Sequence, residues 1–300
     1  MVLGVSLSPD WLRGVVIKNG QTIFRTQLLA PVDYRLIVES ISQMLLRIKN
    51  TYGSLSTVGI CSLYGSSLPC TSEKTSKFII EDEITKKTAI PCKMFSPAFV
   101  ILSNSCEDML SELNGVIMSA VVDYCCDLCI AHKNEPYENF YNTNNLVWSQ
   151  RNLYHQELID EFLPECEHCG RRCVQHFIPI SSIQRHYSHR SGLNKNFLEI
   201  FQLVAHGDNT SLTLYRVWID QLARSLYEPI LLFKPKILIL SGLATIPLDF
   251  LYNLKSRLSY YLKNNELPDI VASHYDDYLF AHYTALVSHK KTKQPSTIQW

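Results

Sequence analysis

The order of apolar segments at the start of the chain constrains the fold more than any other feature of the sequence. Two short runs rich in β-branched residues, Val2–Leu7 and Leu12–Ile17, precede Asn19-Gly20, a dipeptide typical of tight hairpin turns. Asp33–Tyr52 then carries apolar residues at helical spacing and ends at a glycine, and Thr57–Ser62 has the composition of a buried strand. An antiparallel meander, a helix and a strand in this order predict an α/β lobe.

The rest of the chain alternates between β and helical patterns in the same way. We expect strands near Cys92–Ser96, Gly115–Tyr124, Ile237–Leu240 and Ile270–Ser273, and helices near Glu81–Lys87, Val100–Asn114, Asn196–His206, Ser211–Leu232, Pro247–Lys263 and Asp276–His289. Residues 131–165 are polar, aromatic and irregular, which is typical of a loop region or a small β insertion. The length predicts two lobes, over residues 1–106 and 107–289, with a tail over 290–300.

Charge balance and apolar run lengths exclude two classes of protein. Twenty-eight basic residues balance twenty-eight acidic ones, so the chain lacks the basic footprint that drives binding to nucleic-acid phosphates. The apolar stretch Ile230–Leu240 is interrupted by charged residues and proline, and it falls well short of the roughly 20 residues of a membrane-spanning helix. Residues 1–14 lack the features of a signal peptide. We expect a cytoplasmic protein that contacts neither DNA nor membrane directly.

Three cysteines and a histidine have the spacing of a metal site. Cys166, Cys169 and Cys173 form C-x2-C-x3-C, and His155 stands eleven positions before the first of them. Tetrahedral zinc needs four soft or borderline ligands, and such short spacings let one loop present several thiolates. We expect these four residues to hold a structural zinc ion in a loop over about residues 155–175. His168 and His176 compete with the histidine ligand, and reduced thiols in a metal-free loop are the alternative.

A second cysteine group lies on an apolar β run, and we expect an ordinary strand to continue through residues 123–127. Cys125, Cys126 and Cys129 have Asp123 and Asp127 beside them, but no histidine stands at ligand spacing. Thiols of this kind are common in protein cores. We therefore assign these cysteines to the core and give them no chemistry.

The zinc loop, set between two α/β halves, resembles the signature of the ROK family of sugar kinases and repressors. The family pattern is C-x-C-G-x2-G-C-x-E, and residues 166–175 here read CEHCGRRCVQ, so the outer cysteines keep their separation and Gln175 replaces the glutamate. The resemblance covers almost the whole chain and is strongest to allose kinases from Leu222 to His289. It implies a two-lobed actin-like ATPase or hexokinase fold, which is ribonuclease H-like, with the last helix packing back towards the N-terminal lobe.

Positions that carry phosphate chemistry in the family are changed in this chain. The family loop D-x-G-G-T after the first strand reads SLSPD over residues 6–10. Ser6 cannot hold magnesium as a carboxylate would, Pro9 removes an amide donor, and Asp10 restores a charge only through a shifted register. The catalytic aspartate of the family's N-D-x-N motif corresponds to Pro97, which cannot accept a proton, and Phe99 replaces a sugar-binding amide.

The nucleotide and sugar motifs are thinned as well. The second phosphate loop, G-T-G-x-G in the family, corresponds to residues 123–127, where Asp123 and Asp127 would repel phosphate and no glycine remains. Only Gly242 survives of three glycines in the third nucleotide segment. The large residues Phe280 and Tyr283 stand on the final helix where the family has small ones. The sugar motif G-E-x-G-H keeps only its histidine.

These changes favour a ROK-fold pseudokinase that regulates or scaffolds a protein partner and holds zinc as its structural cofactor. Two alternatives stay open: a divergent hexose kinase of allose-kinase type, which would bind ATP and magnesium near Ser8, Asp10 and Gly242, and a sugar sensor without catalysis. The chain begins directly with the first strand, so we expect none of the N-terminal DNA-binding domain that the family's repressors carry. The family's habit of dimerising implies a homodimer.

Overall fold

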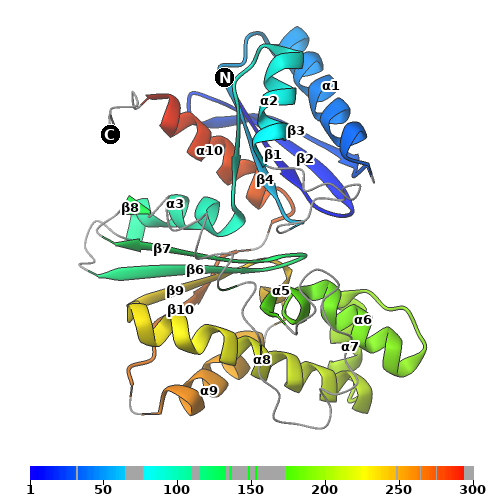
Figure 1. The fold of residues 1–300 in the computed structure, drawn as a ribbon, viewed down its shortest axis with the longest axis vertical. Helices are drawn as coiled ribbons and strands as arrows, with labels where there is room; N and C mark the ends of the chain where they lie inside the picture. The colour runs from blue at the N-terminus through cyan, green and yellow to red at the C-terminus, as the bar shows by residue number, and fades with distance from the viewer. Residues whose placement is uncertain are drawn as a thin grey trace. The chain divides into compact units, whose positions relative to one another are not determined.

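The computed structural model describes residues 1–31, 33–64, 77–109, 115–132, 135–136, 148, 153, 173–247, 249–263, 265–274 and 276–293. The chain divides into two compact units: unit 1 comprises Met1–Glu107 with Asp276–Trp300, and unit 2 comprises Asp108–Tyr275. Each unit contains a five-stranded mixed sheet with helices packed against it (Figure 1). The α/β class expected from the sequence is confirmed.

The sheet of unit 1 contains the N-terminal meander. Its strand order is β3-β2-β1-β4-β5, in which the first three strands are antiparallel and the last two join β1 in parallel. The turn at Asn19-Gly20 has a positive φ at both residues, as a tight hairpin turn requires. The strands are β1 (Val2–Leu7), β2 (Trp11–Lys18), β3 (Gln21–Leu29), β4 (Thr57–Ser62) and β5 (Cys92–Phe95).

Helices cover both faces of this sheet. α1 (Tyr34–Tyr52) and α2 (Lys77–Thr88) share a core with the odd-numbered residues of β1, whereas α10 (Leu279–Lys293) packs on the other face against Val2 (Figure 1). This division follows the two-residue period of a strand, which sends neighbouring side chains to opposite faces. A further helix, α3 (Pro97–Met109), follows β5 directly.

Two glycines let α10 approach the sheet closely. Gly4 of β1 and Gly59 of β4 are partners in the parallel register. A Cβ on Gly4 would collide with the carbonyl oxygen of Ala281, and one on Gly59 would collide with the Oγ of Ser288. The last helix therefore rests on the bare backbone of the two central strands and belongs to unit 1. The sequence division placed its residues in the range 107–289, with the helix expected to pack back towards the N-terminal lobe.

Unit 2 repeats the sheet arrangement of unit 1. Its order is β10-β9-β6-β7-β8, with an antiparallel meander from β6 to β8 and two parallel strands on the other side of β6. The strands are β6 (Val116–Val122), β7 (Cys126–His132), β8 (Glu135–Pro136), β9 (Ile237–Ser241) and β10 (Asp269–Ala272). The helices are α5 (Val174–Phe177), α6 (Ile180–Ser191), α7 (Phe197–Ala205), α8 (Asn209–Phe233), α9 (Phe250–Leu262) and the 3-10 helix η2 (Leu243–Thr245).

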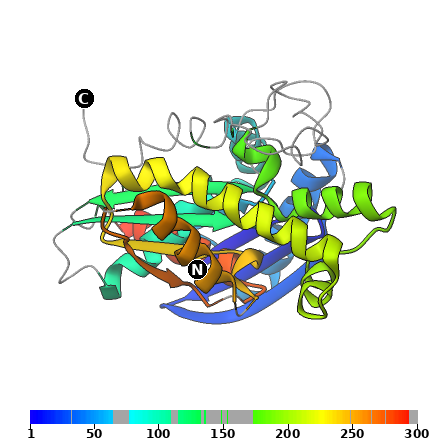
Figure 2. The same cartoon turned by 90° about the horizontal axis from the view of Figure 1, so that it is seen from below.

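The core of unit 2 lies between its sheet and the helices α8 and α9, which run side by side across it (Figure 2). Trp218 of α8 packs against Phe250, with ring centroids 5.8 Å apart, and its Nε1 donates to the carbonyl oxygen of Ile178 at 2.8 Å. This bond ties the segment before α6 to the centre of the core. Among the helices that the structure describes, none is both long enough and apolar enough to cross a membrane.

Some elements differ from the sequence-based expectation. The helix expected over Val100–Asn114 begins at Pro97, because proline suits the first turn of a helix, and it is described as far as Met109, with residues 110–114 outside the described residues. The strand expected to continue through residues 123–127 is interrupted instead: β6 ends at Val122, and the chain turns and returns antiparallel as β7 from Cys126. Helix α6 was not predicted. Most of residues 131–165 and of the expected zinc loop over 155–175 lie outside the described residues.

Candidate functional site

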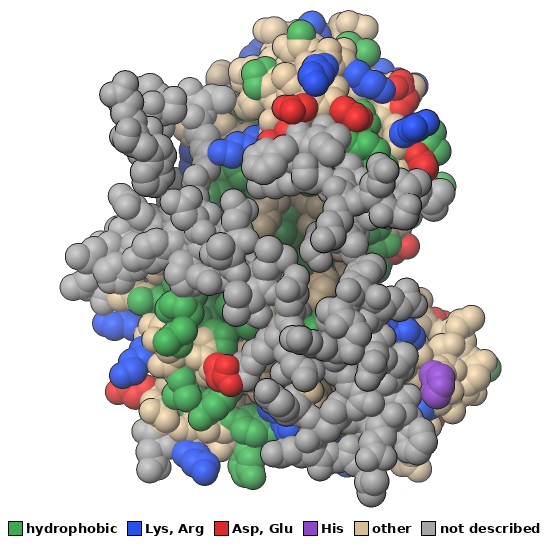
Figure 3. All heavy atoms as spheres, viewed as in Figure 1, with side chains coloured by type: hydrophobic (Ala, Val, Ile, Leu, Met, Phe, Trp, Pro, Cys, Tyr) green, Lys and Arg blue, Asp and Glu red, His purple; other side chains and the backbone are tan. Residues whose placement is uncertain are grey.

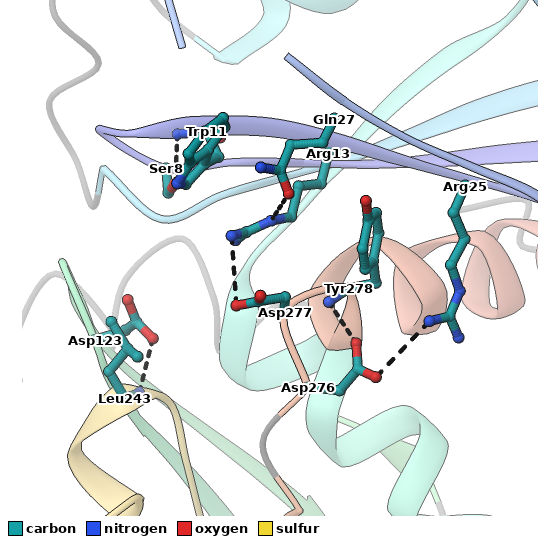
Figure 4. Close-up of polar contacts among 10 residues, drawn as sticks. All are labelled: Ser8, Trp11, Arg13, Arg25, Gln27, Asp123, Leu243, Asp276, Asp277 and Tyr278. Carbon is teal, nitrogen blue, oxygen red and sulfur yellow. Dashed lines mark hydrogen bonds and ion pairs between the residues drawn. The ribbon is translucent and has the colours of Figure 1, made fainter. Parts of the chain in front are cut away.

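The turn between β1 and β2 in unit 1 holds the residues that the resemblance aligned with the ROK family's first phosphate loop. Ser8 is buried, its N–H donates to the carbonyl oxygen of Trp11 at 2.9 Å, and its Oγ accepts from the N–H of Trp11 at 3.1 Å (Figure 4). Pro9 has no N–H to offer. Three of the four backbone nitrogens over residues 8–11 are therefore closed to a phosphate, and the turn is built to join two strands.

The carboxylate that a shifted register would supply also lies in this turn. Asp10 is exposed and stands near Tyr64, whose phenol has a pKa raised by burial and, to a lesser extent, by the charge of Asp10. Ser6 is buried within β1 and pairs with Arg13 on one side and Cys61 on the other. The carboxylate of Asp10 thus lies at the surface of the turn. Ser6, aligned with the family's acidic residue, presents a buried hydroxyl group instead.

The residue that the resemblance aligned with the ROK family's catalytic base lies at the start of α3. Pro97 is the first residue of this helix, and the N–H of Val100 donates to the carbonyl oxygen of Ser96 at 3.1 Å. Phe99, at the position of the sugar-binding amide, is buried and stacks on Phe95 with ring centroids 5.9 Å apart. The local sequence therefore forms a well-packed helix start and provides no acceptor for a proton at either position.

A polar network that the sequence did not predict fixes the segment before α10. Arg13 of β2 donates from Nε to the Oε1 of Gln27 at 3.1 Å, and its Nη2 lies 3.4 Å from the Oδ1 of Asp277 (Figure 4). Arg25 of β3 lies 3.8 Å from the carboxylate of Asp276. Two neighbouring acidic residues just before a helix were a usable signal, but their arginine partners stand some 250 residues earlier in the chain.

In unit 2 the turn between β6 and β7 carries a buried carboxylate. Asp123 is 1% exposed; its Oδ1 accepts from the N–H of Tyr124 at 2.8 Å and its Oδ2 accepts from the N–H of Leu243 at 2.9 Å (Figure 4). The backbone of Asp123 is also engaged, because its carbonyl oxygen accepts from the N–H of Ile180. One side chain thereby ties together two segments that correspond to separate nucleotide loops of the family.

Gly242 makes this connection sterically feasible. Its φ is +102°, and a Cβ at this position would collide with the carbonyl oxygen of Val122. The glycine lets the chain after β9 pass directly over the end of β6, so that the next amide points at the carboxylate of Asp123. The surviving glycine of the third nucleotide segment thus serves an internal contact in this structure.

The second carboxylate and the neighbouring thiols lie in the interior of unit 2. Asp127 is 2% exposed and accepts from the N–H of Leu128 at 3.0 Å. Burial raises the pKa of the Cys126 thiol well above its ordinary value, and the charges of Asp127 and Asp123 raise it further. Cys125 and Cys129 are also buried, the environment expected from the sequence.

One of the four expected zinc ligands lies in the described part of the chain. Cys173 is 2% exposed at the start of α5. It lies close enough to Cys126 to contribute to the raised pKa of the Cys126 thiol. His176, a competing ligand, has its Nε2 3.2 Å from the Nη2 of Arg185. Among the described residues no group of three or more histidine, cysteine, aspartate or glutamate side chains is arranged to hold a metal. His155, Cys166, Cys169 and His168 lie outside those residues, so the zinc site stays a prediction.

Comparison with known proteins identifies the fold. No protein-family model and no curated protein matches the sequence. The ROK hexokinase from Thermus thermophilus has a TM-score of 0.75 at 13% identity, with 97% of this chain and 99% of that chain covered. A ROK family glucokinase from Streptomyces griseus, solved with glucose and AMPPNP, has a TM-score of 0.76 at 12% identity over 96% and 99% of the two chains. A ROK family transcriptional regulator, a homologue of the E. coli MLC protein, reaches 0.71 at 13% identity over 96% and 77%.

The chain therefore has the fold of ROK hexokinases, glucokinases and regulators over nearly its whole length. This finding confirms, at the level of the fold, the resemblance that the sequence motifs indicated. The shared fold hosts both enzymes and a regulator, so the chemistry has to be argued from the residues themselves.

Proposed function

We propose that this chain belongs to the ROK family, that it no longer transfers phosphate, and that it acts by binding a protein partner. The observation that carries the proposal is the bond from the Leu243 N–H to the buried carboxylate of Asp123. By the family motif, both residues stand at nucleotide loops, where backbone amides approach phosphate oxygens. Here an internal anion already accepts from one of those amides.

Electrostatics makes this arrangement unfavourable for a nucleotide. Two like unit charges about 4 Å apart repel by about 4 kcal/mol at the effective dielectric constant near a protein surface. Asp127 places a second buried carboxylate in the same segment. A triphosphate brought to these loops would meet two carboxylates and no added cation from the described part of either loop.

The positions in unit 1 support the same proposal independently. Proline at position 97 cannot act as a general base, and three of the four backbone nitrogens over residues 8–11 cannot donate to a phosphate. An acid, a base and two phosphate loops are lost at separate places in the sequence. A single error in aligning the chain with the family motifs would not produce all of these losses. We extend the proposal to the structural zinc ion at His155, Cys166, Cys169 and Cys173, to a homodimer and to a cytoplasmic location.

An ATP-dependent hexose kinase is the second candidate, and the solved structures favour it. The structures of similar fold include a hexokinase and a glucokinase that was crystallised with glucose and AMPPNP. For this candidate the exposed carboxylate of Asp10 is the residue in the first turn that can approach magnesium. A sugar sensor without catalysis is a third reading that needs no phosphate site.

Three measurements on the full chain separate these candidates. The kinase should release ADP from ATP and magnesium with at least one hexose of a panel that includes glucose and allose. The sensor should show a sugar-dependent rise in Tm without ADP release, because a ligand stabilises the state that binds it. Our proposal expects no turnover and no shift of Tm with AMPPNP, and turnover that disappears in the Asp10→Asn variant would overturn it in favour of the kinase.

A further inference from the structure

Helix α6 and the start of α7 border an open groove of about 710 Å³ in unit 2. The groove is far in sequence from the positions that correspond to the family's nucleotide loops, and the side chains that line it are polar or basic. These residues are Gln184, Arg185, Ser188, His189, Asn194, Lys195 and Asn196. In Figure 3 the surface over α6 and α7 is drawn mainly in tan, the colour of other side chains and the backbone.

The segment around the groove is enriched in basic residues. Residues 174–198 contain three arginine or lysine residues, three histidines and no aspartate or glutamate, whereas the whole chain has 28 lysines and arginines against 28 aspartates and glutamates. The six are His176, Arg185, His186, His189, Arg190 and Lys195. A local excess of one sign on a neutral protein gives that surface a preferred partner of the opposite sign.

The same helix also carries a buried histidine close to several of these basic residues. His186 is 7% exposed, and its pKa is lowered to about 3, first by burial and then by the charges of Arg185, His176, Arg190 and His189. Every charged group that acts on it is cationic. Four basic groups thus act together at one place in the fold.

The groove is preformed by hydrogen bonds within the described residues. Gln184, Arg185, Ser188 and His189 share one face of α6, since they are spaced one, four and five positions apart. Ser188 Oγ donates to Asn194 Oδ1 at 2.7 Å, so the amide of Asn194 has its NH2 group left as a donor. Asn196 and Glu199 form a capping box that fixes the start of α7, and the Oε1 of Glu199 also lies 3.3 Å from the Nζ of Lys195. The wall offers donors on a rigid frame.

We propose that this groove binds an acidic segment of a protein partner through its carboxylate side chains. Its open form and length of lining suit an extended chain better than a small anion, for which an enclosed pocket is usual. Nucleic acid fits less well, because the aromatic residues that could stack on bases are buried here, as in Phe197, Phe201 and Trp218. The inference deepens the proposed function by giving the protein partner a place and a chemistry, but it does not depend on the loss of kinase activity.

Fluorescence anisotropy with the full chain and a labelled poly-glutamate peptide tests the proposal. We expect saturable binding that weakens as salt is raised, and no binding of a poly-glutamine peptide of the same length. A labelled single-stranded oligonucleotide is the second probe. If the oligonucleotide binds as tightly as poly-glutamate and competes with it, the groove is a nucleic-acid site and the proposal is wrong.

Matched variants place the binding in the groove. The double variant His189→Gln with Lys195→Gln should weaken poly-glutamate binding at least about fivefold. The double variant Arg216→Gln with Lys255→Gln removes two cations of unit 2 that do not line the groove and should leave the affinity unchanged. Tm measurements check that both remain folded.

Equal losses in the two double variants, or no binding of poly-glutamate to the wild-type chain, would overturn the groove as an acidic-peptide site. The ADP-release assay is a separate measurement. A chain that binds poly-glutamate in the groove and also turns over ATP would refute the pseudokinase and leave this inference intact. If the chain neither binds poly-glutamate nor turns over ATP, the pseudokinase proposal stands and the proposal of an acidic-peptide groove is wrong.

Discussion

The carboxylate of Asp123 accepts a hydrogen bond from the N–H of Leu243, a residue 120 positions later in the chain, at 2.9 Å. The same carboxylate accepts from the N–H of Tyr124. A neutral side chain of the same shape cannot satisfy both donors, because an amide has one acceptor oxygen and one donor group. Asp123 therefore holds two backbone segments together by hydrogen bonds, in addition to placing a negative charge where it would repel phosphate.

Replacing Asp123 by asparagine should lower the free energy of unfolding by about 1–3 kcal/mol, since one buried N–H loses its acceptor. Urea denaturation of the full chain, followed by circular dichroism, measures the change. The matched control is Asp269→Asn, which alters an exposed aspartate on β10 of the same sheet and should change stability little. Equal stability of both variants would contradict the role given to the Leu243 bond.

The close packing of α10 on Gly4 and Gly59 gives a second prediction. Gly4→Ala should destabilise unit 1 by about 1–3 kcal/mol or more, because the new Cβ meets backbone atoms of Ala281 and Ala285 that have no rotamer to change. Gly59→Ala should cost less, since its nearest obstacle is the side chain of Ser288. The two values come from thermal or urea unfolding.

The control for this prediction is a double variant. Ser288→Ala removes the Oγ with which the new methyl group of Gly59→Ala would collide, so the two changes together should recover part of the lost stability. The same serine change should not help Gly4→Ala. Recovery in both backgrounds, or in neither, would show that α10 does not rest on these glycines.

His186 predicts how stability depends on pH. Burial, followed by four neighbouring cations, lowers its pKa to about 3, so it stays neutral in the folded state where an ordinary histidine takes up a proton near pH 6.5. Between these values the unfolded chain binds more protons, and stability must fall as pH drops from about 6.5 towards 3. The slope from this group approaches about 1.4 kcal/mol per pH unit.

The variant His186→Leu should lose this contribution, so the difference in unfolding free energy between wild type and variant should narrow or reverse as the pH falls from about 7.5 to about 5. His274→Leu changes an exposed histidine and should keep the wild-type slope. Parallel curves for wild type and His186→Leu would count against a neutral buried imidazole.

Local patterns made much of the fold predictable. The β-branched runs, the Asn19-Gly20 turn and the helical period of Asp33–Tyr52 correspond to β1 to β3 and α1 within a few residues. The periodic signal failed at α6, where serine, histidine and arginine interrupt the apolar pattern, and serine and histidine also lower the intrinsic helix propensity. It also failed at β7, because a turn of three residues without glycine separates it from β6.

The candidate site was less predictable, because its contacts join residues that are remote in sequence. The family motifs identified Asp123 and Gly242 as changed positions, but nothing in a local window shows that the carboxylate of one accepts from the amide after the other. The arginine pairs of Asp276 and Asp277 are hidden for the same reason. The groove at α6 was missed because its charges are balanced elsewhere in the chain.

The zinc prediction can be tested against a thiol that lies close to the expected site. We expect about one zinc per chain in freshly purified protein and a lower Tm with a chelator, because structural metal binding is coupled to folding. Cys169→Ser should lower the zinc content. Cys126→Ser should not, although Cys126 lies near Cys173, because burial raises the pKa of its thiol and zinc binds the thiolate. Metal analysis that finds far less than one equivalent, or a loss of zinc on replacing Cys126 alone, would contradict the ligand set His155, Cys166, Cys169 and Cys173.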